Sequence, residues 1–239
     1  MKPIGWSTGC LIQTSLNLIE TVKAYSNSGA NALEISFGKI VELEKFELTT
    51  ELREAVRKFS YVSIHAPWNI QYPGVFTHKT FEKLESLCSS LPVQGIVVHP
   101  SQVSDFAVFE QKDLPWLMEN IIERNSERFG THPEHFEKLK RNYNFGFVFD
   151  SQHAYENDSS MNLAMELIEV MGGRLKHMHI SGMTGTLHHA PVYAADNRDA
   201  ISRILDLKLP VPVILEGSIT DKVNDTLAKE FDFIKRYDA

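Results

Sequence analysis

The chain has 239 residues, of which 43% are hydrophobic, and it carries a formal net charge of −7 and two cysteines. The cysteine count excludes a disulfide framework, the lack of any apolar run near ~20 residues excludes a membrane span, and the acidic balance argues against nonspecific attraction to nucleic acid. Because the N-terminus also lacks the apolar core of a secretion signal, we expect one cytoplasmic domain over residues 1–239. We expect no membrane contact and no obligatory protein partner.

Segments typical of strands and helices alternate along the chain with short connections, as in a parallel α/β sheet. The expected strands cover residues 4–8, 31–36, 60–66, 94–99, 114–119, 145–150, 175–181 and 211–216. The expected helices cover residues 15–28, a segment from about 51, 79–90, 133–142, 159–171, a segment from about 196, and 220–237. Right-handed crossovers in this order either close a barrel or build a doubly wound sheet.

Two features of the sequence favour the barrel. The segment after the first strand reads STGCLIQTS, so the G-x-G-x-x-G turn of dinucleotide-binding sheets is missing. Six apolar runs instead end in metal-ligand side chains: His65, His99, Glu119, Asp150 with His153, His177 with His179, and Glu216. A buried strand that ends in an unpaired ionisable group is unfavourable unless something compensates the group. We therefore predict a single (β/α)8 TIM barrel whose active site lies where the strand ends converge.

The strand endings combine imidazole nitrogen with carboxylate oxygen, a mixture that zinc, manganese and iron accept. Asp150 and His153 form a D-x-x-H pair directly after the run FGFVF, which places a carboxylate at a strand end and an imidazole in the loop beyond it. A carboxylate can also bridge two cations, whereas a neutral imidazole cannot. The sequence therefore predicts a site for divalent metal, with zinc expected and manganese or iron as alternatives.

In these motifs the chain resembles the endonuclease IV group of the xylose-isomerase-like TIM barrels, over nearly its whole length. The motifs that carry the resemblance are HAPW at His65, HPS at His99, the pair Glu119-Asn120, DSQH from Asp150, MHI around His179 and ILE ending at Glu216. The resemblance implies one to three metal ions per chain. It assigns the first to His65, His99 and Glu119, the second to Glu119, Asp150, His179 and Glu216, and the third to His153 with a loop histidine.

The chain departs from the family pattern in the loop that follows residue 181. The family has an Asp two residues before its loop His, whereas Leu187 precedes His189 and Thr186 precedes His188 at that spacing. A related group of UV-damage endonucleases also lacks this Asp. We take His189 as the ligand, with His188 as the open alternative, and we expect the third site to be one carboxylate short.

Two more ionisable residues lie on expected strands. We expect His177, which alternates with His179, to point to the opposite face of its strand as a hydrogen-bonded structural residue. Glu34, at the end of the second strand, has two alternatives: it enters the site, or it pairs with a core Arg or Lys.

Candidate substrate contacts follow the strand ends. In the endonuclease family, the loop after the third strand presses bulky side chains into DNA, and Trp68 stands where an aromatic is found. The alternative is that Trp68 roofs a small pocket. Asn69 and Asn120 complete the predicted substrate-binding set, and Arg124 and Arg128 are candidates either for phosphate contacts or for a solvated loop.

Two functions fit this pattern. The first is metal-dependent phosphodiester hydrolysis, with DNA at an abasic site as substrate and Glu119 and Glu216 as catalytic groups. The second is isomerisation or epimerisation of a small sugar at a single metal, with the same two carboxylates carrying the proton. The four ligands of the second metal serve both functions. The additional His65, His99 and His189 favour hydrolysis, whereas the short chain and the missing Asp favour the isomerase.

Overall fold

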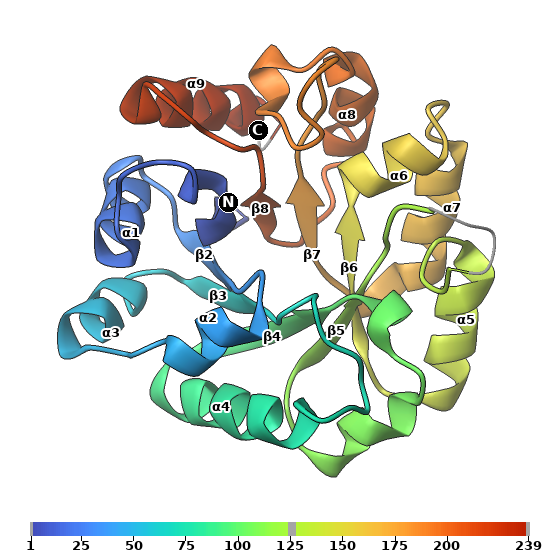
Figure 1. Ribbon diagram of the computed structural model, residues 1–239. Coiled ribbons are helices and arrows are strands. Elements are labelled where there is room, and N and C mark those ends of the chain that lie inside the picture. The colour runs from blue at the N-terminus through green and yellow to red at the C-terminus, as the bar shows by residue number, and fades with distance from the viewer. Residues whose placement is uncertain (1, 124–127, 238–239) are drawn as a thin grey trace.

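The computed structural model describes residues 2–123 and 128–237, and it shows a closed barrel of parallel strands inside a ring of helices (Figure 1). The strands are β1 (Ile4–Ser7), β2 (Ala32–Ser36), β3 (Tyr61–His65), β4 (Val93–Val98), β5 (Trp116–Glu119), β6 (Gly146–Asp150), β7 (Leu175–Ile180) and β8 (Val213–Leu215). Each strand pairs in parallel with the next along the chain, and β8 pairs with β1 to close the barrel. The predicted (β/α)8 barrel is confirmed.

Two short 3-10 helices, Pro100–Gln102 and Phe106–Gln111, connect β4 to β5. The other seven strands are each followed by one or two α-helices, which cover the outside of the barrel (Figure 1). They are α1 (Leu18–Asn27), α2 (Ile40–Lys45), α3 (Thr50–Val56), α4 (Thr77–Ser90), α5 (Pro133–Asn142), α6 (Ser151–Asn157), α7 (Asn162–Met171), α8 (Arg198–Leu205) and α9 (Val223–Lys235). None of the helices in the described residues is long and apolar enough to span a membrane.

The strands lie close to their expected positions: seven fall inside the predicted ranges, and β4 begins one residue earlier. Two helices, α2 and α6, were not expected. Helix α2 begins where Glu42 accepts hydrogen bonds from the backbone N–H groups of Gly38 and Lys39. Helix α6 begins directly at the end of β6, because the Asp150 side chain accepts from the backbone N–H of His153 and caps the helix.

Alternation along the strands separates two layers of packing. Residues such as Leu33, Ile64 and Phe149 point outward and form the large core between barrel and helices. The inward-facing residues of the lower barrel form two small apolar clusters: Ala32, Tyr61 and Ile214, and Val97, Leu117 and Val148. The next inward positions along the strands are ionisable or hydroxyl-bearing, so the interior changes from apolar to polar toward the C-terminal ends of the strands.

The lower interior is filled tightly around Leu117. A Cβ atom on Gly95 would lie 2.4 Å from one methyl group of Leu117, and a Cβ atom on Gly146 would lie 2.5 Å from the other. Glycine is therefore required on both neighbouring strands, because real Cβ contacts do not approach so closely. This packed floor makes the upper end of the barrel the open end.

Candidate metal centre

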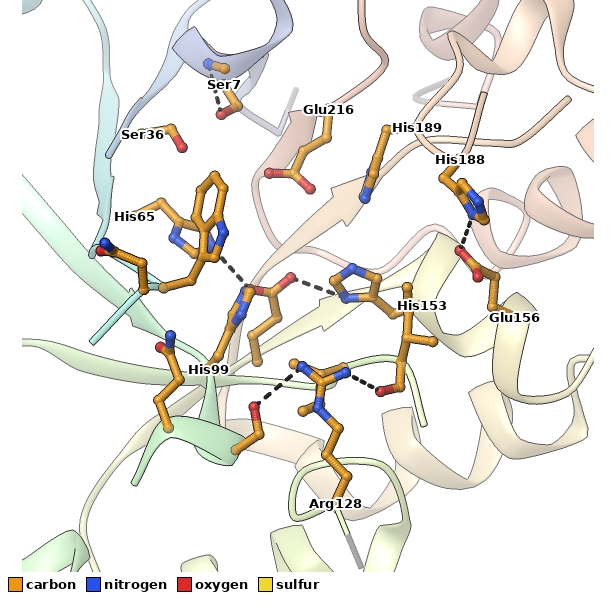
Figure 2. Close-up of a pocket in the computed structure, with 18 of the residues that line it drawn as sticks. Ser7, Ser36, His65, His99, Arg128, His153, Glu156, His188, His189 and Glu216 are labelled. Carbon is orange, nitrogen blue, oxygen red and sulfur yellow. Dashed lines mark hydrogen bonds and ion pairs between the residues drawn. The ribbon is translucent and has the colours of Figure 1, made fainter. Parts of the chain in front are cut away.

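Six of the predicted ligands converge at the C-terminal ends of six consecutive strands, β3 to β8. These residues are His65, His99, Glu119, Asp150, His179 and Glu216. They surround or underlie an open cavity of about 1070 Å³. Figure 2 shows His65, His99, His153, His189 and Glu216 directed into this cavity from different sides.

The Glu119 carboxylate lies at the centre of the cluster and is almost completely buried. Its Oε2 atom is 3.2 Å from Nε2 of His65 and 3.2 Å from Nε2 of His99. Its Oε1 atom is 3.1 Å from Nδ1 of His179 and 3.5 Å from Nδ1 of His153. The two oxygens of one carboxylate therefore face two separate groups of nitrogen ligands, as a carboxylate shared between two cations would.

A second set of ligand atoms adjoins Glu119 Oε1. Glu119, Asp150, His179 and Glu216 each offer one ligand atom within 4.8 Å of the others. His179 Nδ1 is 3.5 Å from Glu216 Oε2 and 4.0 Å from Asp150 Oδ2. This Asp150 oxygen is buried without a hydrogen-bond partner, while the other oxygen of the same carboxylate caps α6. An unpartnered buried carboxylate oxygen is unfavourable, and a bound cation would satisfy it.

The charge of the site also fits divalent cations. Five carboxylates lie in, at the rim of or beneath the cavity: Glu34, Glu119, Asp150, Glu156 and Glu216. Arg128 is the sole Lys or Arg among the described residues that line it. Buried carboxylates are stable only when they are paired or bind metal. Two imidazole–carboxylate groups of three and four ligands match the donors that zinc, manganese and iron accept.

The neighbours of Glu119 shift the pKa values of the site in opposite directions. Burial alone would raise the pKa of Glu119, but His179 and His99 outweigh burial and hold the pKa well below its ordinary value. Burial alone would lower the pKa of His65, whereas the contact with Glu119 raises that pKa to about 9. The pKa of His99 is lowered, chiefly by burial. The cluster therefore keeps a carboxylate ionised at its centre and holds a proton on His65, whereas His99 loses its proton more readily than an ordinary histidine.

Glu216 behaves differently from Glu119. Burial raises its pKa well above the ordinary value, and although His179 acts in the opposite direction, Asp150 and Glu119 add to the rise. A cation bound among these groups would replace the proton that Glu216 otherwise retains.

The residues predicted for a third metal come together only in part. His153 lies on α6 rather than in a loop as we expected, and its Nδ1 atom contacts the backbone carbonyl of Asn120 at 2.9 Å. The His153 and His189 rings are 5.5 Å apart between centroids, and His189 Nδ1 contacts Ser181 Oγ. No group of three ligand atoms among the described residues includes either histidine.

The structure separates the two loop histidines. His188 is at the rim of the cavity, largely exposed, with its Nδ1 atom 3.1 Å from Glu156 Oε1 (Figure 2). His189 is the one placed beside His153. Glu156 was not among the predicted residues. It lies one helical turn after His153, so the spacing would have pointed to it had α6 been expected.

The expected orientation of His177 was wrong. Residues two apart on a strand share a face, and His177 Nε2 lies 3.0 Å from His179 Nε2 inside the barrel. Glu34 also enters the interior: its Oε2 atom accepts from Ser63 Oγ at 2.8 Å and lies 3.2 Å from His179 Nε2. Among the described residues, its partners are thus histidines and a serine rather than a core Arg or Lys.

The predicted substrate contacts occupy three different environments. Trp68 is 49% exposed and stacks over His99, with ring centroids 6.4 Å apart and an interplanar angle of 20°. Asn69 lines the cavity, and its Oδ1 atom accepts from the backbone N–H of Ile40. Asn120 is fully buried, and its amide exchanges two hydrogen bonds with the backbone of Asp150. Asn120 therefore positions a ligand and does not line the cavity.

The two basic candidates also differ. Arg128 lines the cavity and donates to the backbone carbonyl of Ile122 at 2.7 Å and to Ser101 Oγ at 3.4 Å. Arg124 lies outside the described residues.

No protein-family model matches the chain, and comparison with curated proteins gives no match. Solved structures do match it over nearly its full length. Endonuclease IV from Thermus thermophilus is 19% identical, with a TM-score of 0.73 over 98% of both chains. A D-tagatose 3-epimerase-like protein is 16% identical, with a TM-score of 0.69 over 98% of this chain and 96% of that one. The probable 3-DHS dehydratase from Bacillus anthracis is 14% identical, with a TM-score of 0.71 over 98% of this chain and 99% of that one. At these identities the similarity shows the shared fold alone, a (β/α)8 TIM barrel, as predicted.

Proposed function

We propose that this chain is a metal-dependent phosphodiester hydrolase with a two-metal centre, and that DNA carrying an abasic site is a substrate. The position of Glu119 carries the proposal, because its two oxygens face His65 and His99 on one side and His179 on the other. A single-metal isomerase centre built on Glu119, Asp150, His179 and Glu216 gives His65 and His99 no ligand role. The fold of endonuclease IV is compatible with this function but does not select it.

In this proposal, His65, His99 and Glu119 Oε2 hold one cation, and Glu119 Oε1 with Asp150, His179 and Glu216 holds the other. Two divalent cations in such a site supply an activated water and stabilise the attacking and leaving oxygens of a phosphodiester.

The protein's own groups orient the substrate. Burial lowers the pKa of His189, so this imidazole is neutral near pH 7 and able to donate one hydrogen bond to a phosphate oxygen. Trp68, stacked on His99 and half exposed, covers one wall of the site and offers an aromatic face to a displaced nucleoside. Arg128, which lines the cavity on the side away from Glu216 (Figure 2), is the cation that would face a flanking phosphate.

A second candidate, epimerisation or isomerisation of a small sugar, is favoured by the chemistry of the cavity wall. Hydroxyl and amide side chains line much of it: Ser7, Ser36, Asn69, Gln71, Ser101, Gln102 and Ser218. Such groups suit a polyhydroxylated ligand, and a single Arg gives little attraction for a polyanion. In this alternative, Glu119 and Glu216 flank the substrate and exchange its proton.

Metal content and substrate assays together separate the two candidates. The chain, reconstituted with zinc or manganese, would be compared with the double variant His65→Ala/His99→Ala by elemental analysis. The proposal expects the double variant to lose one ion per chain and to lose cleavage of duplex DNA with a single abasic site. An unchanged metal content, with epimerisation of ketoses retained by both proteins and no DNA cleavage by either, would overturn it.

A further inference from the structure

The interior of the barrel holds a second group of ionisable side chains beneath the metal centre. Glu34 projects inward from β2, Tyr61 and Ser63 from β3, and His177 and His179 from β7. All five are buried. The proposed hydrolysis uses one of them, His179, through its Nδ1 atom, which leaves the remaining groups without a role.

Three ligand atoms in this interior group point toward one position. The distances are 3.0 Å from His177 Nε2 to His179 Nε2, 3.2 Å from His179 Nε2 to Glu34 Oε2, and 3.5 Å from His177 Nε2 to Glu34 Oε2. A tetrahedral zinc ion with bonds of about 2.0–2.1 Å keeps its ligand atoms roughly 3.3 Å apart. The observed triangle therefore has the dimensions of one face of a zinc tetrahedron.

Hydrogen bonds alone do not satisfy the group. At most one proton can lie between the two Nε2 atoms. Glu34 Oε2 accepts from Ser63 Oγ, but Glu34 Oε1 is buried with no hydrogen-bond partner. An unpartnered carboxylate oxygen in a barrel interior is unfavourable, whereas a cation at the centre of the triangle would bring this oxygen within reach as a further ligand.

The atoms around the triangle match the surroundings of a metal-bound histidine. A ligand histidine usually bonds through its second ring nitrogen to a carboxylate, carbonyl or hydroxyl that fixes the ring. Here His177 Nδ1 lies 2.7 Å from the Tyr61 hydroxyl. His179 differs, because its Nδ1 atom faces Glu119 and Glu216 in the centre above.

We propose that Glu34, His177 and His179 bind a divalent cation of the zinc class inside the barrel, in a site separate from the cavity and joined to it through the His179 ring. With both sites filled, each nitrogen of the His179 ring would face one cation, and the protons displaced from these two nitrogens would pass to solvent water. The inner ion neutralises the negative charge of Glu34, whose ion pairs within the described part of the chain are with histidines alone. It also fixes the orientation of the His179 ring, which is a ligand of the outer centre. The proposal of the inner site is the same whether the cavity hydrolyses a phosphodiester or isomerises a sugar.

Metal counting on matched variants tests the inner site without reference to activity. Zinc-reconstituted Glu34→Gln and His177→Gln proteins should each contain one ion fewer per chain than the wild type. His78→Gln, which changes an exposed imidazole on α4 that does not line the cavity, should leave the count unchanged. Tyr61→Phe keeps the ring but removes the hydroxyl at His177 Nδ1, and it should weaken zinc binding at the inner site by about 10–100-fold.

The location of the ion is checked on the wild-type protein, so this test does not depend on whether the variants fold. Crystals of the zinc-loaded chain, measured on both sides of the zinc absorption edge, should give an anomalous peak between Glu34, His177 and His179. Peaks confined to the cavity, with an unchanged metal content in His177→Gln, would overturn the inner site. The loss of one ion in His65→Ala/His99→Ala is a separate result, because those residues contact the outer centre alone.

Discussion

At the residue scale, Glu119 is the group on which the proposed outer centre depends. The change Glu119→Gln keeps the size of the side chain but replaces one oxygen with an amide nitrogen, which cannot bind a cation and carries no charge. We expect the loss of at least one metal ion and a fall in turnover of at least about 10²-fold, because even outer partners of metal ligands are worth 10–100-fold. Elemental analysis and kcat on the active substrate measure both effects.

The control for this change is Glu137→Gln, the same substitution at a half-exposed carboxylate on α5 that pairs with Arg141. It should alter neither metal content nor turnover, because exposed ion pairs contribute little. Full turnover of the Glu119 variant with an unchanged metal content would contradict the shared-ligand role.

The strand-end ligands could be predicted from the sequence because an ionisable group at the end of a buried run needs a compensating partner. Partners that come from distant segments could not. Asn120 follows Glu119 in the chain and was predicted to bind substrate, but its amide is bound to the backbone of Asp150, thirty residues away. The error over His177 had another origin, since the period of a strand places residues two apart on one face. Applied correctly, that rule would have placed His177 beside His179.

At the scale of elements, Asp150 couples the metal centre to helix α6. One of its oxygens caps the helix by accepting from the His153 backbone N–H at 2.7 Å, and the other faces the ligands. Asn caps helices about as well as Asp, whereas Ala removes the cap at a loss of about 1 kcal/mol. We therefore expect metal-free Asp150→Asn to unfold near the wild-type urea midpoint and Asp150→Ala to unfold earlier, while both variants bind less metal.

Urea unfolding of the chelated proteins and elemental analysis of the loaded ones measure the two roles separately. Equal destabilisation by Asn and Ala would show that the cap contributes nothing. Normal metal content in Asp150→Asn would remove Asp150 from the ligand set.

The elements that the sequence did not predict are short. Helices α2 and α6 have six and seven residues, which is about two turns and too few for a 3.6-residue period to emerge from the sequence. The strands were easier to place because each is a mostly buried run in which about half or more of the residues are apolar. This explains the error over His153. The end of β6 was predicted correctly, but the short helix α6, which carries His153, was taken for a loop.

At the scale of the whole molecule, the acidic interior makes stability depend on pH when metal is absent. The folded chain holds protons that the unfolded chain releases, because the pKa of His65 is raised to about 9, chiefly by its contact with Glu119 against the effect of burial, and burial raises that of Glu216. An unfolded histidine titrates near pH ~6.5. The stabilisation from His65 is therefore complete below about pH 6.5 and is lost as the pH rises to about 9.

We expect metal-free protein to lose on the order of 2–3 kcal/mol of unfolding free energy between about pH 6.5 and 9, because the pKa of His65 is raised from 6.5 to about 9 on folding. The histidines with lowered pKa values, His99, His177 and His189, oppose this loss only near the lower limit of the interval, because above about pH 7.5 they are neutral in both the folded and the unfolded chain. Urea unfolding of chelated protein at several pH values measures the trend, and His65→Gln should flatten it. With zinc present the trend should reverse, because ligands that have lost their protons bind metal more tightly. A midpoint that stays constant or rises with pH in the chelated protein would contradict the proton-holding cluster.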